Sequence, residues 1–125
     1  MNKELLIVDD DPSIIIAVKM VFEEEGYKVH TANSGMECIS ELENGFKGVI
    51  LMDIMMPKMD GWDTIEEIVK KDLHKGNIIA MLTAKDIPDI KMNPLKEYVT
   101  DYLTKPFEAE EIVDTVNEYN NLLNE

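Results

Sequence analysis

Side chains that could do chemistry together stand at the ends of four short apolar runs of this sequence. Three are carboxylates, one is a hydroxyl and one is an ammonium: Asp9, Asp10, Asp53, Thr83 and Lys105. If the three carboxylates converge to about 5 Å, each pair repels by roughly 3 kcal/mol at an effective dielectric of about 20. A fold that keeps such a cluster needs a compensating cation.

An oxygen-rich cluster without sulfur selects a hard cation, and Mg2+ fits it best. Mg2+ held by few carboxylates keeps room for water and phosphate oxygens. One carboxylate beside such an ion can attack phosphorus and become an aspartyl phosphate. The ammonium of Lys105 and the hydroxyl of Thr83 would then stabilise the phosphoryl oxygens. The sequence therefore predicts a Mg2+-dependent phosphoryl-transfer site.

The elements that must position these side chains alternate between strand and helix. Short apolar runs predict strands at 5–8, 27–31, 48–52, 78–82 and 98–103. Helices are predicted to begin near positions 12, 34, 62, 87 and 107. Strands separated by helices predict an α/β fold, with a parallel sheet covered by helices on both faces. In such folds the site lies beyond the carboxyl ends of the strands.

Local signals predict where several helices begin and end. Asp11 is the expected N-cap of the first helix, with Pro12 at its first position and Gly26 after its end. Its charge therefore serves the helix N-terminus and not the cluster. Ser34 is the expected cap of the second helix. The helix at 87–96 should be weak, because two prolines restrict it.

Helical spacing also predicts which side chains are buried. Those expected to face inward are Ile15, Val18, Met20 and Phe22 in the first helix, Ile39 and Leu42 in the second, Ile65, Ile68 and Val69 in the third, and Ile112, Val113, Val116, Tyr119 and Leu123 in the last. Cys38 falls in an apolar register and should be a small buried hydrophobe. It is the single cysteine, so no internal disulfide can form.

Composition sets the remaining limits. A chain of 125 residues, 45% of them hydrophobic, fits one domain, 1–125. Its formal net charge of −14 disfavours nucleic acid and anionic membranes as partners. No apolar stretch approaches the length of a membrane span and no signal peptide is visible, so a cytoplasmic location is expected.

With these residues in view, the sequence resembles the receiver domains of two-component response regulators. The matching segments are LLIVDDDPSI, VILMDIMMPKMDGWD, IIAMLTAKD and DYLTKPF, in order over almost the whole chain. The resemblance implies a flavodoxin-like, doubly wound fold with strand order 2-1-3-4-5 and five helices on both faces. It also implies a single receiver domain, 1–125, with no output domain on this chain.

The resemblance assigns the phosphoryl site residue by residue. Asp53 matches the phosphoacceptor. Asp10 matches a direct Mg2+ ligand, and Asp9 one that acts mainly through water. The backbone carbonyl of Met55 matches the third protein ligand, and Lys105 matches the family's lysine.

Other positions match the family's switch and loop. Thr83 matches the hydroxyl that moves towards the phosphoryl group, and Tyr102 matches the aromatic residue whose ring then turns inward. The bond from Lys105 to Pro106 is expected to be cis, and Pro57 and Gly61 shape the loop after the acceptor. Two variable positions, Met55 and Lys85, are expected to tune the lifetime of the phosphoryl group.

These assignments imply a phosphorylation-dependent signalling switch. It would take phosphate from a donor and lose it by hydrolysis, but would not be a turnover enzyme. His30 and His74 lie outside the inferred site, so the donor should be an external sensor histidine kinase or phosphotransfer protein. The surface of the fourth helix, fifth strand and fifth helix would control a separate, unidentified protein. Segment 98–103 departs from the family's commonest pattern, so that partner stays unassigned.

Four other interpretations stay open. The chain could be a relay intermediate that passes phosphate to a phosphotransfer protein. A Mg2+-dependent phosphohydrolase of the haloacid dehalogenase type would resemble D-x-D at its nucleophile, and Asp53-Ile54-Met55 lacks the second Asp. A flavodoxin-like cofactor binder needs a phosphate loop after the first strand, where Asp9-Asp10-Asp11 would repel phosphate. A receiver that only docks is disfavoured, because all the site's residue types are present.

Overall fold

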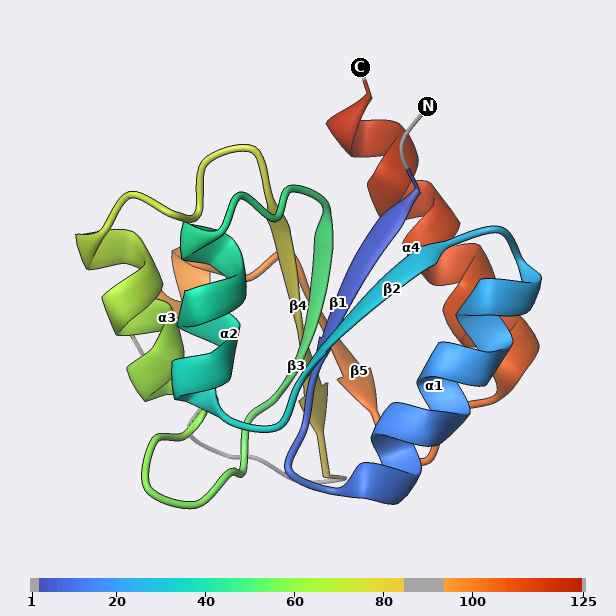
Figure 1. Cartoon of the computed structure of the whole chain (residues 1–125), viewed down its shortest axis with the longest axis horizontal. Coiled ribbons are helices and arrows are strands. Elements are labelled where there is room, and N and C mark those ends of the chain that lie inside the picture. The colour runs from blue at the N-terminus through green and yellow to red at the C-terminus, as the bar shows by residue number, and fades with distance from the viewer. Residues whose placement is uncertain (1–2, 85–93, 125) are drawn as a thin grey trace.

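Five short strands form one parallel sheet in the order β2-β1-β3-β4-β5 (Figure 1). The computed structural model describes residues 3–84 and 94–124. The strands are β1 Glu4–Val8, β2 Lys28–Ala32, β3 Val49–Asp53, β4 Ile78–Thr83 and β5 Asp101–Thr104. The predicted parallel sheet and its strand order are confirmed.

Helices cover both faces of the sheet. They are α1 Pro12–Glu24, α2 Gly35–Glu43, α3 Gly61–Lys70 and α4 Ala109–Leu123. Helices α2 and α3 lie on one face, and α1 and α4 lie on the other (Figure 1). The prediction of five helices is corrected to four α-helices within the described residues. The fifth helix was expected at 87–96, and most of that segment lies outside the described residues.

The segment before β5 differs from its prediction. Pro94–Tyr98 forms a 3-10 helix, so β5 begins at Asp101 and not at Tyr98. The ring of Tyr98 packs edge-on against His74, with centroids 5.3 Å apart. That contact holds Tyr98 over the α3 side, where it cannot continue the sheet. The prediction that Tyr98 begins the fifth strand is therefore wrong.

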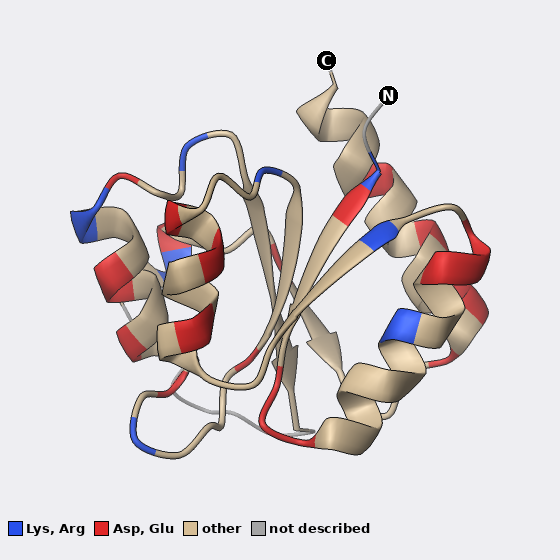
Figure 2. Cartoon of the chain, in the orientation of Figure 1, with Lys and Arg blue, Asp and Glu red and all other residues tan. Residues whose placement is uncertain are grey.

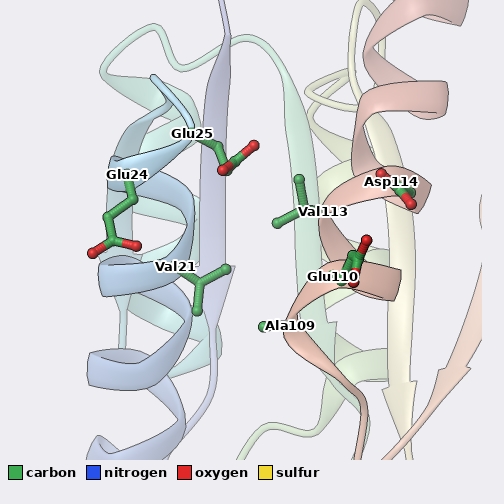
Figure 3. Close-up of a pocket in the computed structure, with 7 residues that line it drawn as sticks. All are labelled: Val21, Glu24, Glu25, Ala109, Glu110, Val113 and Asp114. Carbon is green, nitrogen blue, oxygen red and sulfur yellow. The ribbon is translucent and has the colours of Figure 1, made fainter.

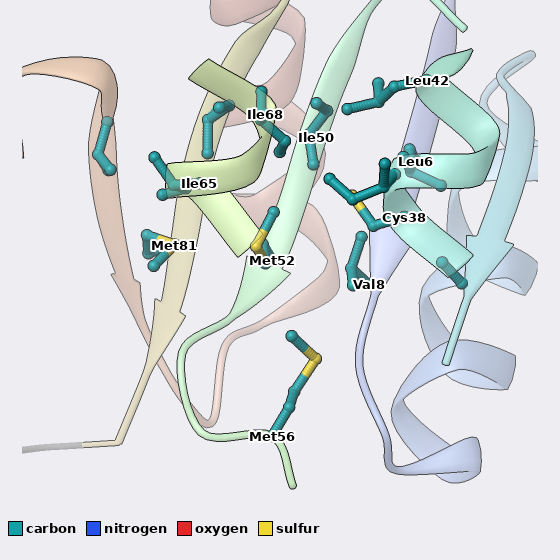
Figure 4. Packing of buried hydrophobic residues seen from close by; sticks show 14 of the residues in the cluster. Leu6, Val8, Cys38, Leu42, Ile50, Met52, Met56, Ile65, Ile68 and Met81 are labelled. Carbon is teal, nitrogen blue, oxygen red and sulfur yellow. The ribbon is translucent and has the colours of Figure 1, made fainter. Parts of the chain in front are cut away.

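The central strands are apolar at almost every position because both of their faces are covered. Successive side chains of a strand point to opposite faces. In β1, Leu6 and Val8 accordingly join the core under α2 and α3, while Leu5 and Ile7 join the core under α1 and α4. Figure 4 shows the first of these cores, with the buried thiol of Cys38 inside it.

Most helix ends and faces follow their sequence signals. The Asp11 carboxylate caps α1 by accepting from the Ser13 backbone N–H at 2.9 Å, and the Ser34 hydroxyl caps α2. Met20 is a correction: it is 63% exposed, whereas Val18 and Phe22 are buried. At 100° per residue, position 20 lies about 200° from position 18, on the opposite side of the helix.

Candidate functional site

Three carboxylates converge at the carboxyl ends of β1 and β3. Asp9 follows β1 and is fully buried, Asp10 is exposed, and Asp53 is the last residue of β3 and only 8% exposed. One oxygen from each lies within 4.8 Å of the others. The strands are adjacent and parallel, with Val8 paired to Met52, so residues just beyond the pair meet at the same edge.

A lysine directly after β5 completes the cluster. The Lys105 ammonium lies 2.8 Å from Asp9 Oδ2 and 3.6 Å from Asp53 Oδ1. Its backbone N–H donates to the Thr83 carbonyl at 2.8 Å, which extends the pairing of β4 and β5 by one residue. The following Lys105–Pro106 bond is cis. One ammonium against three carboxylates leaves the cluster with an excess of negative charge.

The crowding perturbs both ends of the Asp53–Lys105 pair. Burial, and then the charge of Asp9, raise the pKa of Asp53 to about 6, while Lys105 and the Met55 N–H oppose the shift. Burial would lower the pKa of Lys105, but its bond to Asp9 and the charge of Asp53 raise it above its ordinary value. The site thus contains a carboxylate whose ionised form is less favourable than that of an ordinary aspartate, and a further positive charge nearby would stabilise it.

The donor set fits a hard divalent cation. All three side chains offer carboxylate oxygens, and no sulfur or imidazole ligand belongs to the cluster. Oxygen ligands at mixed burial suit Mg2+, which keeps several waters and is held by one or two carboxylates. Asp10, exposed at the rim, can reach such an ion without losing a protein partner, because it makes no ion pair among the described residues.

The loop after β3 is fitted closely to the acceptor strand. The Met55 N–H donates to Asp53 Oδ1 at 3.2 Å, and the Gly61 N–H donates to the Ile54 carbonyl at 2.8 Å. A Cβ at Gly61 would stand 2.9 Å from the Asp53 carbonyl oxygen, so a side chain there would force the backbone to shift. The Met55 side chain is 70% exposed. These contacts fix where the Asp53 carboxylate stands.

The predicted switch residues occupy neighbouring strands. Thr83 ends β4 and is 6% exposed, and Leu82 before it pairs with Asp53. Tyr102 pairs with Met81 in β5, and its ring packs against the core under α2 and α3. Its hydroxyl is buried without a hydrogen-bond partner among the described residues. Lys85 lies outside the described residues.

Two contacts near the switch were not anticipated from the sequence. The Trp62 ring lies 6.4 Å from the Tyr102 ring, centroid to centroid. The Asp101 carboxylate accepts from the Tyr119 hydroxyl at 2.5 Å and from the Tyr102 N–H at 2.8 Å, which ties β5 to α4. The sequence pointed to Asp101 only through its position directly before Tyr102. Its hydrogen bond to Tyr119 joins residues 18 positions apart and leaves no local sequence pattern.

Comparison with known proteins decides the family. The family model for the response regulator receiver domain matches residues 5–117. The chain belongs to this family. It is therefore a receiver domain of two-component response regulators, and the resemblance seen in its sequence is confirmed. Receiver domains of this family are signalling modules, so the phosphohydrolase and cofactor-binder interpretations lose their support.

The receiver's relatives include longer regulators. The alkaline phosphatase synthesis transcriptional regulatory protein PhoP of Bacillus subtilis (strain 168) is 38% identical over 112 residues, which are 90% of this chain and 46% of that protein. The transcriptional regulatory protein SrrA of Staphylococcus aureus (strain NCTC 8325) is 38% identical over 114 residues, with the same two coverages. The chain thus spans about half the length of the curated relatives it matches.

Solved receiver structures agree with the fold. A CheY-like response regulator receiver domain protein from Methanospirillum hungatei JF-1 superposes with a TM-score of 0.92 at 47% identity, covering 97% of this chain and 96% of that one. The receiver domain of sensor histidine kinase PA1611 from Pseudomonas aeruginosa PAO1 gives 0.83 at 26% identity, covering 97% and 99%. That structure has a magnesium ion coordinated in its active site cleft.

Within residues 3–84 and 94–124, the structure contains no helix that is both long enough and apolar enough to cross a membrane.

Proposed function

We propose that this receiver domain is a signalling switch that accepts a phosphoryl group on Asp53 in a Mg2+-dependent reaction. One observation carries the proposal. Asp53 ends β3 within 4.8 Å of the carboxylate oxygens of Asp9 and Asp10 and 3.6 Å from the ammonium of Lys105. A nucleophile, an oxygen-only cation site and a fixed positive charge are the parts that phosphoryl transfer to an aspartate needs.

Asp10, Asp53 and the backbone carbonyl of Met55 would hold the Mg2+, and Asp9 would act mainly through water. The magnesium found in the related PA1611 receiver supports this assignment. When bound, the ion neutralises charge on the phosphoryl oxygens and on the carboxylates. The excess negative charge of the cluster, which Lys105 alone does not balance, is what the ion would offset.

In the transfer, a carboxylate oxygen of Asp53 bonds to phosphorus as the bond from phosphorus to the donor's imidazole nitrogen breaks. The electron pair of that bond returns to the imidazole, which takes a proton from water. The Lys105 ammonium, 3.6 Å from Asp53 Oδ1, is placed to bind a phosphoryl oxygen as charge passes from the carboxylate to the phosphate. The donor is a sensor histidine kinase or a phosphotransfer protein.

The signal would leave through β5 and its neighbours. Thr83 would donate its hydroxyl to a phosphoryl oxygen, and Tyr102 would respond on the adjacent strand. The surface concerned is the family's fourth helix, fifth strand and fifth helix, which here includes the 3-10 helix Pro94–Tyr98, β5 and α4. Its target would be a protein surface, because the acidic charge of the chain disfavours nucleic acid and membrane.

Two positions would set how long the phosphoryl group lasts. Met55 is 70% exposed beside Asp53 and offers no hydrogen bond to an attacking water. Lys85, two residues after Thr83, is the second position. We expect Met55→Asn to speed autodephosphorylation, measured as loss of the phosphorylated mass over time. An unchanged hydrolysis rate would count against a role for this position.

Phosphorylation can be tested with acetyl phosphate as donor and intact mass as readout, with Mg2+ or with EDTA. The wild-type chain should gain one phosphoryl group only with Mg2+, and Asp53→Asn should gain none. Asp72→Asn is the matched control: it removes an exposed carboxylate at a positive φ that Asn also tolerates, and it should be modified like the wild type. Modification of Asp53→Asn, or modification in EDTA, would refute the proposal.

A further inference from the structure

Helices α1 and α4 lie on the face of the sheet away from α2 and α3 (Figure 1). A groove runs between these two helices (Figure 3). Its outer part has a volume of about 430 Å³ and lies between the C-terminal half of α1 and the first turns of α4. A smaller hollow of about 120 Å³ continues it towards Phe107. The two parts share Val21 and Ala109, so they form one feature, which we call the α1–α4 groove.

The floor of the α1–α4 groove is apolar. Val21 and Val113 lie between the two helices, as Figure 3 shows, and Ala109 borders both parts of the groove. Phe22 lines the smaller hollow and is fully buried. Small side chains on both walls, Ala17 on α1 and Ala109 on α4, keep the space between the helices unfilled. An inserted apolar side chain would therefore meet apolar surface.

The rim of the α1–α4 groove is acidic on both walls. Glu24 and Glu25 end α1, and Glu110 and Asp114 stand on α4. Figure 2 shows acidic positions at the end of α1 and on the first half of α4. The lining contains no Lys or Arg, and the ion pairs among the described residues include none of these four carboxylates.

We propose that the α1–α4 groove docks a cationic amphipathic segment of a partner protein. An apolar side chain of that segment would lie over Val21 and Val113, and flanking Lys or Arg would face the carboxylates of the rim. Complementary charge at a rim selects partners and speeds encounter, while the buried apolar contact supplies affinity. Phosphates of nucleic acid or lipid would meet like charge here. A second copy of this chain, at a net charge of −14, would be repelled as a whole.

The outer part of the groove is separate from the phosphoryl site. Helix α1 begins beside that site at Pro12, and Glu24 at its other end lies about 18 Å further along the helix axis. A segment bound over the outer part of the groove therefore needs no contact with Asp53. The phosphoryl chemistry and the groove can accordingly fail or succeed independently in experiment.

The test uses a helix-forming peptide of about 15 residues, with Leu on one face and Lys flanking it, and the whole chain labelled with 15N. Glu25→Gln/Glu110→Gln removes one carboxylate from each wall. Glu66→Gln/Glu67→Gln, on α3 on the opposite face, removes the same charge and is the matched control. Ala109→Phe fills the groove without changing charge. Urea unfolding followed by circular dichroism checks that each variant is folded.

Amide shift changes should gather on 17–25 and 107–114. Each exposed charge pair contributes about threefold in affinity, so Glu25→Gln/Glu110→Gln should weaken binding about tenfold in low salt. Ala109→Phe should weaken it similarly, and the α3 control should bind like the wild type. Equal weakening by both double variants, shift changes scattered over other acidic surfaces, or no binding at all would overturn the proposal. So would self-association through these residues in sedimentation.

Discussion

Asp53→Asn should make the protein more stable while removing its phosphoacceptor. Burial, and then the charge of Asp9, raise the pKa of Asp53 from 3.8 to about 6. Each pKa unit corresponds to about 1.4 kcal/mol, so the shift amounts to about 3 kcal/mol before solvent screening. Halving this for a carboxylate that still reaches water leaves about 1–2 kcal/mol. We expect this gain in the free energy of unfolding at pH 7 without divalent cations.

The amide keeps the neutral contacts of the site. Asn Oδ1 can still accept from the Met55 N–H, and Lys105 keeps its 2.8 Å bond to Asp9. The attraction between Asp53 and Lys105 is lost, but the raised pKa shows that burial and repulsion outweigh it. The substitution therefore removes an unfavourable charge and leaves no unpaired group behind.

The pH dependence has a defined sign. In the unfolded chain Asp53 titrates near 3.8, and in the native state near 6. Between these values the native state holds the proton and the unfolded state does not, so the wild type loses stability relative to Asp53→Asn as pH rises. The gain of the variant should be absent below about pH 4 and complete above about pH 6.

Urea unfolding followed by circular dichroism, in EDTA and low salt from pH 4 to pH 8, measures this gain. Asp114→Asn, which removes an exposed carboxylate from α4, is the control and should change stability by less than about 0.5 kcal/mol. Mg2+ at ten times its dissociation constant should stabilise the wild type by about 1.4 kcal/mol and the variant by less. An Asp53→Asn protein no more stable than the wild type at pH 7, or a gain constant over this pH range, would refute the reasoning.

Three further substitutions or reactions probe the packing around the site. The Cys38 thiol is fully buried, and burial raises its pKa to about 12. A disulfide reagent should therefore leave Cys38 unmodified in the native protein and modify it in urea. Reaction at the same rate in both conditions would contradict the packing. Gly61→Ala should lower the free energy of unfolding in urea by about 1–3 kcal/mol and slow phosphorylation, because its Cβ would stand 2.9 Å from the Asp53 carbonyl oxygen. Wild-type behaviour in both assays would show that the loop accommodates the methyl group without cost. Tyr119→Phe removes the hydrogen bond to Asp101 and should cost about 1–3 kcal/mol, and a loss below 0.5 kcal/mol would show that this bond does not hold β5 to α4.

Much of the fold and site follows from local sequence. A strand covered on both faces must be apolar at successive positions, and this rule located β1, β3 and β4. Asp11 and Ser34 marked helix starts, because an uncapped N-terminus leaves backbone N–H groups without partners. The residues directly after the strands could be named as a site, because the carboxyl ends of parallel strands meet at one edge of a sheet.

Local sequence patterns gave wrong predictions at positions where contacts between distant parts of the chain determine the structure. Met20 lies in an apolar stretch but on the outer side of α1, since its exposure depends on which side of the helix meets the sheet. The ring of Tyr98 packs against that of His74, and β5 begins three residues later than predicted, at Asp101. The sequence around Met20 or Tyr98 does not indicate which residues surround that side chain in the fold.

The sequence by itself determined the types of side chain at the strand ends and the family to which they belong. Only the tertiary structure decided the energetics, because the interacting groups are far apart in the chain. Lys105 bonds to Asp9 across 96 residues, and it is Asp9 that helps burial to raise the pKa of Asp53. The α1–α4 groove likewise exists only because two helices from opposite ends of the chain pack on one face of the sheet, which brings their carboxylates together.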